Sequence, residues 1–188
     1  MTAPPRVYLT GFMASGKSTV GPLLADALGH RFVDLDWLIE AKAGRPIPLI
    51  FAEGGEAAFR VAEAEALAET TRSRRMVVAT GGGALVTPAA LRTARMAGPV
   101  VWLRASVDIV LDRLGDATGR PILAGPDGRP LWGQALRERV ETLMEAREPF
   151  YAQADLTIDA DPAAAVVAQR VMEGLRGWGR PREGKMET

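Results

Sequence analysis

Residues 11–18, with the sequence GFMASGKS, match the spacing G-x-x-x-x-G-K-[ST] and give the strongest chemical signal in the chain. In this pattern, the backbone N–H groups of a glycine-rich loop surround phosphate oxygens, and the dipole of the following helix favours their negative charge. Lys17 supplies charge to the outer phosphates of a nucleotide, and the Ser18 hydroxyl is placed to ligate Mg²⁺. The alternative, a structural turn with a chance Lys-Ser pair, fits less well because a strand precedes the loop and a helix follows it. We predict that the phosphates are bound by Ala14, Ser15, Gly16, Lys17, Ser18 and Thr19.

Two carboxylates follow the next β-rich run. Asp34 and Asp36 are two residues apart, so we expect them to share one face and to project into one crevice. Such a pair can hold a Mg²⁺-bound water, orient a substrate hydroxyl or accept its proton. The alternative is that one of them, Asp36 in particular, caps the following helix.

Arg60 lies one helical turn after Glu56 and one turn before Glu63. Taken alone, this spacing favours a solvated ion-pair face, worth a few tenths of a kcal/mol per pair. Two further arginines lie near Gly- and Pro-rich segments. Arg120 fits either a loop that closes over phosphates or an ordinary exposed loop, and Arg147 fits a helix-terminal cation.

Gly81, Gly82 and Gly83 follow a third β-rich run. Three consecutive glycines cost more chain entropy than a turn requires, so they suit a place where backbone approaches a ligand closely. A loose connection is the alternative.

Short β-rich runs that alternate with helical patterns must position these residues. We expect strands at residues 7–9, 32–35, 76–79, 100–103 and 156–158. We expect helices at residues 17–28, 37–43, 47–51, 56–70, 88–96, 107–114, 133–148 and 162–175, with Pro149 ending the seventh of them. The alternation predicts an α/β fold: a parallel five-stranded sheet flanked by helices on both faces, with ligands beyond the carboxyl ends of the strands. We expect a single domain over residues 1–176, a Gly/Pro-rich lid at about 115–131 and a disordered tail at 177–188.

The composition excludes several classes of protein. The 188 residues have a formal net charge of zero, which argues against a nucleic-acid or anionic-membrane binder. The absence of cysteine and the single histidine exclude disulfide scaffolds, thiolate sites and a histidine zinc cluster. Because we find neither a membrane-length apolar run nor a signal peptide, we expect a cytoplasmic protein.

In this order and spacing, the motifs resemble those of shikimate kinase, a small P-loop kinase with the nucleoside-monophosphate-kinase type of P-loop NTPase fold. The resemblance extends from residue 8 to about residue 171. It lies in GFMASGKSTVG, FVDLD, FRxxE, the triple glycine, RPILAG after residue 119 and RxPxY after residue 146. The phosphate loop alone indicates only a nucleoside triphosphate, whereas the other elements are more specific and favour a binding role for Arg60.

The resemblance implies a Mg²⁺- and ATP-dependent transfer of the γ-phosphoryl group to the 3-hydroxyl of shikimate, in aromatic amino-acid synthesis, by a monomeric enzyme. By the same resemblance, Asp36 would bind the shikimate hydroxyls and act as base, and Asp34 would support Mg²⁺ through water. The shikimate carboxylate and ring would be held by Arg60, Arg147 and the backbone of Gly81, Gly82 and Gly83. Arg120 would contact the phosphates, and Arg113 and Pro162 would lie near the adenine.

Two other functions remain open at this stage. One is a gluconate-type or other small-molecule kinase on the same fold, although the D-x-D and triple-glycine pattern favours a cyclic polyol acid. The other is a nucleotide-dependent switch without turnover. The combination of Lys17, Ser18, Asp36, Arg60 and Arg120 argues against it.

Overall fold

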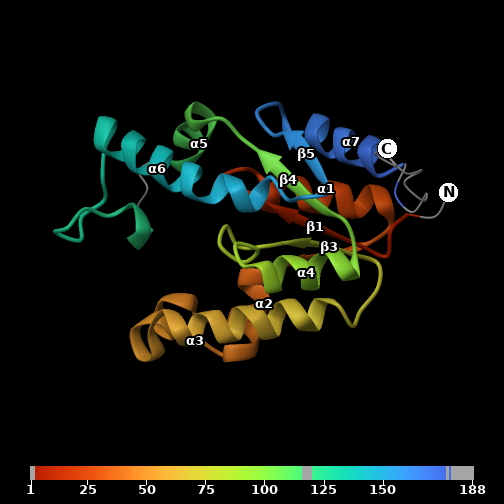
Figure 1. Ribbon diagram of the computed structural model, residues 1–188, viewed down its shortest axis with the longest axis horizontal. Helices are drawn as coiled ribbons and strands as arrows, with labels where there is room; N and C mark the ends of the chain where they lie inside the picture. The colour runs from red at the N-terminus through yellow and green to blue at the C-terminus, as the bar shows by residue number, and fades with distance from the viewer. Residues whose placement is uncertain (1–2, 116–119, 177, 179–188) are drawn as a thin grey trace, which may run out of the picture.

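A parallel sheet runs through the centre of the computed structural model, which describes residues 3–115, 120–176 and 178 (Figure 1). Its strands are β1 (Arg6–Thr10), β2 (Arg31–Asp34), β3 (Met76–Ala79), β4 (Val100–Arg104) and β5 (Leu156–Asp159). They lie in the order β2-β3-β1-β4-β5, and each neighbouring pair is parallel. The five-stranded parallel sheet expected from the sequence is confirmed.

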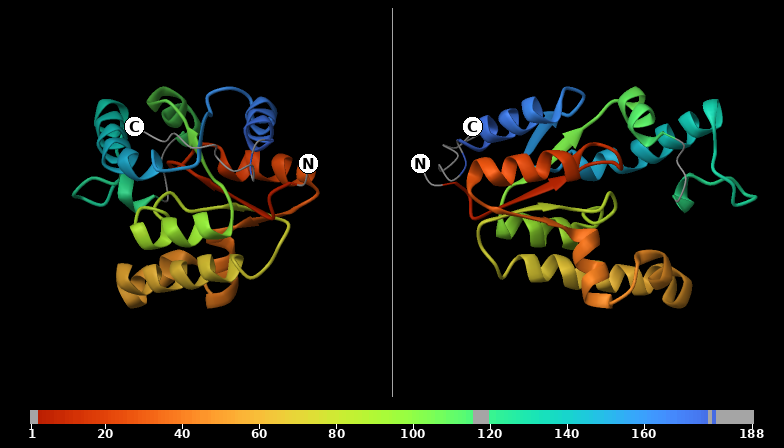
Figure 2. Two further views of the ribbon diagram at one scale, coloured as in Figure 1. Left: turned by 45° about the vertical axis from the view of Figure 1, so that its right-hand side comes forward. Right: turned by 180° about the vertical axis from the view of Figure 1, so that it is seen from behind.

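Helices cover both faces of this sheet, as the alternating pattern predicted. They are α1 (Lys17–Leu28), α2 (Leu35–Ala43), α3 (Ile47–Thr70), α4 (Pro88–Ala97), α5 (Val107–Leu114), α6 (Gly133–Tyr151) and α7 (Ala164–Leu175). In all views, α1, α5, α6 and α7 lie on one face, and α2, α3 and α4 lie on the other (Figures 1 and 2). Within the described ranges, no helix is both long and apolar enough to cross a membrane.

The two faces of the sheet bury two separate apolar clusters. Along β1, Val7 and Leu9 enter the cluster beneath α1, α6 and α7, whereas Tyr8 between them enters the cluster beneath α2, α3 and α4. All three side chains are fully buried. Successive side chains of a strand point to opposite faces, so a strand covered on both sides is apolar throughout.

The largest departure from the expected elements is in α6. Pro149 was expected to end this helix, but the structure shows the helix continuing to Tyr151. A proline lacks the backbone N–H donor and disturbs one helical turn. Here the helical hydrogen bonding resumes after it, because the Ala152 N–H donates to the Glu148 carbonyl at 2.8 Å. The expectation that the helix stops at residue 148 was wrong.

The segment expected as two helical pieces forms one element, α3, with a kink at Gly55. Gly55 has φ 66° and ψ −169°, a backbone conformation open essentially to glycine alone. At β2 the strand ends one residue early because Leu35 already opens α2, and α7 begins at Ala164 rather than at residue 162.

The Gly/Pro-rich lid segment has more local structure than its composition suggested. A 3₁₀ turn, η1 (Pro121–Leu123), follows Arg120, and an antiparallel bridge joins Ala124 to Pro130. Residues 116–119 of the expected lid lie outside the described residues, and so does the expected tail except for Trp178.

Candidate active site

The predicted site residues follow the carboxyl ends of three adjacent strands. The phosphate loop follows β1, Asp34 ends β2, and the triple glycine comes one residue after Thr80, which follows β3. The register places Leu9, Asp34 and Ala79 side by side across these strands. The sheet therefore delivers all three segments to one edge, where ligands of open α/β sheets bind.

The phosphate loop ends where α1 begins. Gly16 is the N-cap residue of α1, with φ 96°, and no side chain among the described residues caps this helix. The N–H groups of its first turn are therefore oriented toward the loop, as a phosphate site requires. Ala14 has φ 58°, in the left-handed region that favours glycine.

Lys17 lies against its own loop. Its Nζ donates to the carbonyl oxygens of Gly11 at 2.9 Å and Phe12 at 2.8 Å, and to Ser15 Oγ at 3.4 Å. Burial lowers the pKa of Lys17 to about 8, against the opposing effect of the nearby Asp36 and Asp34 carboxylates. The structure therefore keeps this cation desolvated, and an anionic ligand stabilises its charged form.

A cavity of about 510 Å³ lies in front of the loop. The six residues predicted to bind phosphate all line it, together with Arg113, Arg120, Ala160 and Pro162. Arg113 is fixed in its wall, since its Nη2 donates to the carbonyl oxygens of Ala160 at 2.9 Å and Asp161 at 3.3 Å. The structure thus brings the predicted phosphate and adenine residues into one cavity.

Ser18 and Asp34 form a pair of oxygen ligands at the edge of the phosphate loop. Ser18 Oγ donates to Asp34 Oδ2 at 2.8 Å, while Asp34 Oδ1 accepts from the backbone N–H of Asp36 at 3.0 Å. The residue that caps α2 is therefore Asp34 and not Asp36. Hydroxyl and carboxylate oxygens suit Mg²⁺, which keeps waters and takes its remaining ligands from phosphates. In agreement with that sparse ligand set, the described part of the chain has no cluster of three or more acidic or histidine side chains arranged for a metal.

Asp36 is the most strongly perturbed carboxyl group of the site. Burial, and after it the neighbouring Asp34 carboxylate, raise its pKa to about 6 against the lowering effect of Lys17. A carboxylate with a pKa near neutrality is suited to accept a proton from a hydroxyl group.

Each glycine of the triple-glycine loop faces a different charged side chain. A Cβ atom on Gly81 would lie 3.0 Å from Asp36 Oδ1, one on Gly82 would lie 3.3 Å from Arg147 Nη1, and one on Gly83 would lie 3.1 Å from Arg60 Nη1. A side chain at any of the three positions would therefore press against a charged group, and each of these groups comes from a different helix. The predicted substrate residues Asp36, Arg60 and Arg147 are thereby gathered around one stretch of backbone.

Arg60 reaches this loop from α3. Its Nη1 donates to Glu63 Oε2 at 2.7 Å, and its Nη2 donates to Glu56 Oε1 at 3.1 Å. The side chain of Glu63 is 8% exposed, whereas that of Glu56 is 71% exposed. The buried partner thus orients the guanidinium, and only the Glu56 contact is of the solvated kind that the spacing suggested.

Three residues that belong to the quoted motifs, Phe12, Glu63 and Tyr151, were given no role in the site from the sequence. Glu63 lies close to Gly81 as well as to Arg60. The ring of Phe12 lies 5.5 Å from the Arg147 guanidinium carbon, and the Tyr151 hydroxyl donates to the Gly82 carbonyl at 2.5 Å. A helix drawn through Pro149 would have placed Arg147 and Tyr151 on one face, so the signal for Tyr151 was present in the sequence.

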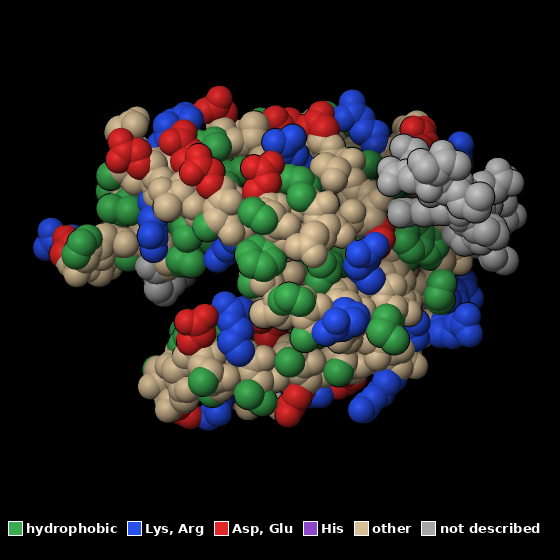
Figure 3. All heavy atoms as spheres, viewed as in Figure 1, with side chains coloured by type: hydrophobic (Ala, Val, Ile, Leu, Met, Phe, Trp, Pro, Cys, Tyr) green, Lys and Arg blue, Asp and Glu red, His purple; other side chains and the backbone are tan. Residues whose placement is uncertain are grey.

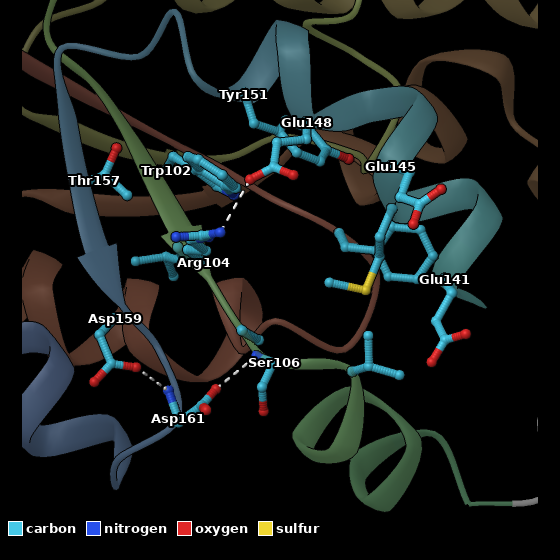
Figure 4. A pocket seen from close by; sticks show the side chains of 15 residues that line it. Trp102, Arg104, Ser106, Glu141, Glu145, Glu148, Tyr151, Thr157, Asp159 and Asp161 are labelled. Atoms are coloured by element: carbon cyan, nitrogen blue, oxygen red, sulfur yellow. Dashed lines mark hydrogen bonds and ion pairs between the residues drawn. The ribbon is translucent and has the colours of Figure 1, made fainter. Parts of the chain in front are cut away.

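The space-filling view shows a hollow between α3 and the end of α6, with basic and acidic side chains at its edge (Figure 3). A second cavity, of about 550 Å³, lies between β4, β5, α5 and α6 (Figure 4). None of the predicted site residues lines it. Several of its polar groups bind one another: Arg104 donates to Glu148 at 3.1 Å, and the Ser106 N–H donates to Asp161 at 2.8 Å. This cavity therefore borders the site at the strand ends, since Phe12 and Tyr151 belong to both.

Comparisons with known proteins agree on one family. The sequence profile of shikimate kinase matches residues 13–176. A shikimate kinase of Salinibacter ruber is 48% identical over 179 residues, which are 95% of this chain and 88% of that protein. The structure of shikimate kinase from Acinetobacter baumannii in complex with shikimate superposes with a TM-score of 0.83 at 33% identity, covering 96% of this chain and 97% of that one.

The rival kinase class is similar in fold alone. A gluconokinase from Sinorhizobium meliloti has a TM-score of 0.62 at 20% identity, covering 94% of each chain. The sequence match is therefore specific to one branch of the fold, and the resemblance inferred from the motifs is confirmed. The chain belongs to the shikimate kinase family, and it is a kinase with a P-loop NTPase fold.

Proposed function

We propose that this enzyme transfers the γ-phosphoryl group of ATP to the 3-hydroxyl of shikimate, giving ADP and 3-phosphoshikimate. The observation that carries the proposal is the triple-glycine loop, which has Asp36, Arg147 and Arg60 against its three residues beside the phosphate loop. A carboxylate base and two arginines around bare backbone suit a small acid with hydroxyl groups. The similar protein from Acinetobacter baumannii was solved in complex with shikimate.

The nucleotide would occupy the cavity in front of α1. Its phosphates would accept hydrogen bonds from the N–H groups of the loop and pair with the Lys17 cation. Arg120, which also lines the cavity, would add a second cation. Arg113 and Pro162, which line the same cavity, would lie near the adenine. Phosphoryl transfer has a loose transition state, so catalysis here consists of positioning and charge neutralisation.

The acid would be held from two sides. Arg60 and Arg147 would bind its carboxylate through paired hydrogen bonds, which select a planar anion over a neutral sugar. Asp36 would accept the proton of the attacking hydroxyl, since its raised pKa makes it a better base than an ordinary aspartate. The base follows β2 and the phosphate loop follows β1, with only β3 between the two strands, so the hydroxyl would face the outer phosphate.

Mg²⁺ fits the pair formed by Ser18 and Asp34, whose oxygens lie within hydrogen-bond distance of each other. When bound, the ion would supply positive charge that offsets the negative charge of the phosphates. Ser18 would ligate it directly, and Asp34 would hold one of its waters.

The pH dependence of kcat/KM follows from two perturbed groups. Asp36 must be ionised to act as base, so activity should fall tenfold per unit below pH about 6. Lys17 must be protonated, so activity should also fall above pH about 8. A coupled ADP-release assay between pH 5 and 9 should therefore give a bell-shaped profile. A flat profile across this range would contradict the assigned roles.

The substrate assignment is tested most directly through Arg60. We expect Arg60→Ala to raise the KM for shikimate at least about a hundredfold, because a charge-assisted contact to the carboxylate is lost, and to leave the KM for ATP unchanged. The measurement is steady-state kinetics with each substrate varied in turn. Shikimate, gluconate and a nucleoside monophosphate should be compared as acceptors of the wild-type enzyme, and only shikimate should support efficient turnover.

Two further variants make the result interpretable. Arg60→Lys keeps the charge beside the buried Glu63 but loses the paired N–H donors of the guanidinium. Its KM for shikimate should therefore lie between those of the wild type and Arg60→Ala. Arg92→Ala, at an exposed position on α4, should behave as wild type. Equal losses of shikimate and ATP affinity in folded Arg60→Ala would remove the proposed role.

A further inference from the structure

The carbonyl of Gly82 is held by two side chains of α6. Tyr151 Oη donates to it at 2.5 Å, and Arg147 Nη1 donates to it at 3.4 Å. The two donors are four residues apart in one helix, so they lie on the same face and reach the same oxygen. The R-x-P-x-Y spacing thus joins a predicted substrate ligand, Arg147, to a residue for which the proposed reaction has no use.

Tyr151 is itself firmly fixed. Its side chain is 3% exposed, and its ring lies 5.8 Å from that of Trp102 on β4. The same ring borders the cavity of about 550 Å³, where Figure 4 shows it beside Trp102, so it lies between that cavity and the triple-glycine loop. Burial raises the pKa of Tyr151 above 10, so its hydroxyl remains a donor throughout the working range of the enzyme.

The triple-glycine loop needs an anchor from outside. Three glycines have no side chains with which to fix their own backbone, and they have the largest conformational freedom to lose. The loop contains hydrogen bonds from Ala84 N–H to the Gly81 carbonyl at 3.1 Å and from Val86 N–H to the Gly83 carbonyl at 3.4 Å. Neither fixes the Gly82 carbonyl, and the Arg147 contact is long, so the 2.5 Å bond from Tyr151 is the shortest restraint on that peptide.

We propose that Tyr151 is a positioning residue: its hydroxyl holds the Gly82 carbonyl, and through it sets the triple-glycine loop and Arg147 in the geometry that receives the acidic substrate. Movement of Gly82 shifts Gly81, which lies against Asp36, and Gly83, which lies against Arg60. It also withdraws the Gly82 carbonyl from Arg147, whose guanidinium carbon lies 5.5 Å from the ring of Phe12. The inference rests on the proposed function for the identity of the substrate. The restraint of the Gly82 carbonyl by Tyr151 does not depend on that function.

The kinetic test uses the only two tyrosines of the chain. Tyr151→Phe removes the hydroxyl and keeps the ring. Tyr8→Phe is the matched control, because the Tyr8 hydroxyl is also buried and hydrogen-bonded, to Thr70 Oγ1 at 3.1 Å, but contacts nothing in the site. We expect Tyr151→Phe to raise the KM for shikimate about tenfold, the worth of one hydrogen bond, with a smaller change in kcat and an unchanged KM for ATP. Tyr8→Phe should change none of the three.

A second measurement does not depend on turnover. Amide hydrogen exchange of the segment 80–84 should be faster in ligand-free Tyr151→Phe than in wild type and unchanged in Tyr8→Phe. If shikimate proves not to be the substrate, this difference should remain, and the proposed function fails alone. Unchanged exchange and an unchanged shikimate KM in Tyr151→Phe would overturn the inference. So would equal increases in both KM values, which would indicate a general packing role.

Discussion

Lys17→Met should lower kcat about a thousandfold, because it removes a preorganised cation from the position where charge develops on the transferred phosphoryl group. The side chain is half-buried against its own loop, and nothing else in the loop carries positive charge. Methionine fills nearly the same space, so the loss is one of charge rather than of volume. The measurement is the initial rate of ADP release at saturating substrates.

Lys42→Met provides the control for this substitution. Lys42 lies on α2 in an exposed ion pair with Glu69, and such pairs contribute little to stability. Its variant should therefore retain wild-type kcat. Both variants should also show the thermal unfolding transition of the parent. A folded Lys17→Met enzyme with near-normal kcat would refute the role of the phosphate loop in this reaction.

Asp36→Asn should lower kcat by a factor of about a thousand to ten thousand, while raising the melting temperature of the ligand-free enzyme. The amide retains the shape of the carboxyl group but cannot accept the proton of the substrate hydroxyl. The gain in stability has a separate cause. The pKa of Asp36 is about 6 in the folded chain, against 3.8 for an unperturbed aspartate, so the folded state holds its proton more tightly than the unfolded state.

The sign of this effect follows from linkage. Between about pH 4 and 6 the unfolded state releases the proton first, so the stability of the wild type falls as the pH rises through this range and remains lower above it. Asparagine removes that penalty, which already includes the attraction to Lys17. Because Asp36 is only half-buried and solvent screens part of the effect, we expect a net gain at pH 7 of about 1 kcal/mol, or a few degrees in melting temperature.

The exposed Asp26 on α1 gives the matched substitution, because Asp26→Asn makes the same chemical change away from the site. It should alter neither kcat nor the melting temperature. An Asp36→Asn protein that is both less active and less stable would show that Asp36 serves the fold, contrary to its assignment as base.

The sheet and the phosphate loop could be predicted from the sequence because their signals are local. A strand buried on both faces is apolar throughout, as Val7, Tyr8 and Leu9 show, and the phosphate loop is a contiguous motif with a fixed geometry. The proximity of Asp36 to the triple glycine also followed, since both come after strands of one parallel sheet.

The remaining features depend on contacts between distant segments. Pro149 was expected to end its helix, but packing of Tyr151 against Trp102 and its bond to Gly82 favour one further helical turn. The role of Glu63 depends on its burial, which spacing along a helix does not reveal. The need for glycine at positions 81–83 is explained by Asp36, Arg147 and Arg60, which approach this loop from three different helices.

The pairing of Arg60 has a consequence for how selectively the enzyme takes up acids. Its guanidinium already donates hydrogen bonds to Glu63 and Glu56, so a second anion meets a cation that is already paired. It must outcompete the solvent-exposed Glu56 while Glu63 stays in place. A simple inorganic anion would gain little binding free energy from this exchange. An acid whose ring also contacts Asp36 and the glycine backbone would gain binding free energy from several contacts. We therefore expect Glu56 to compete with small inorganic anions for Arg60 and so to favour the larger acid.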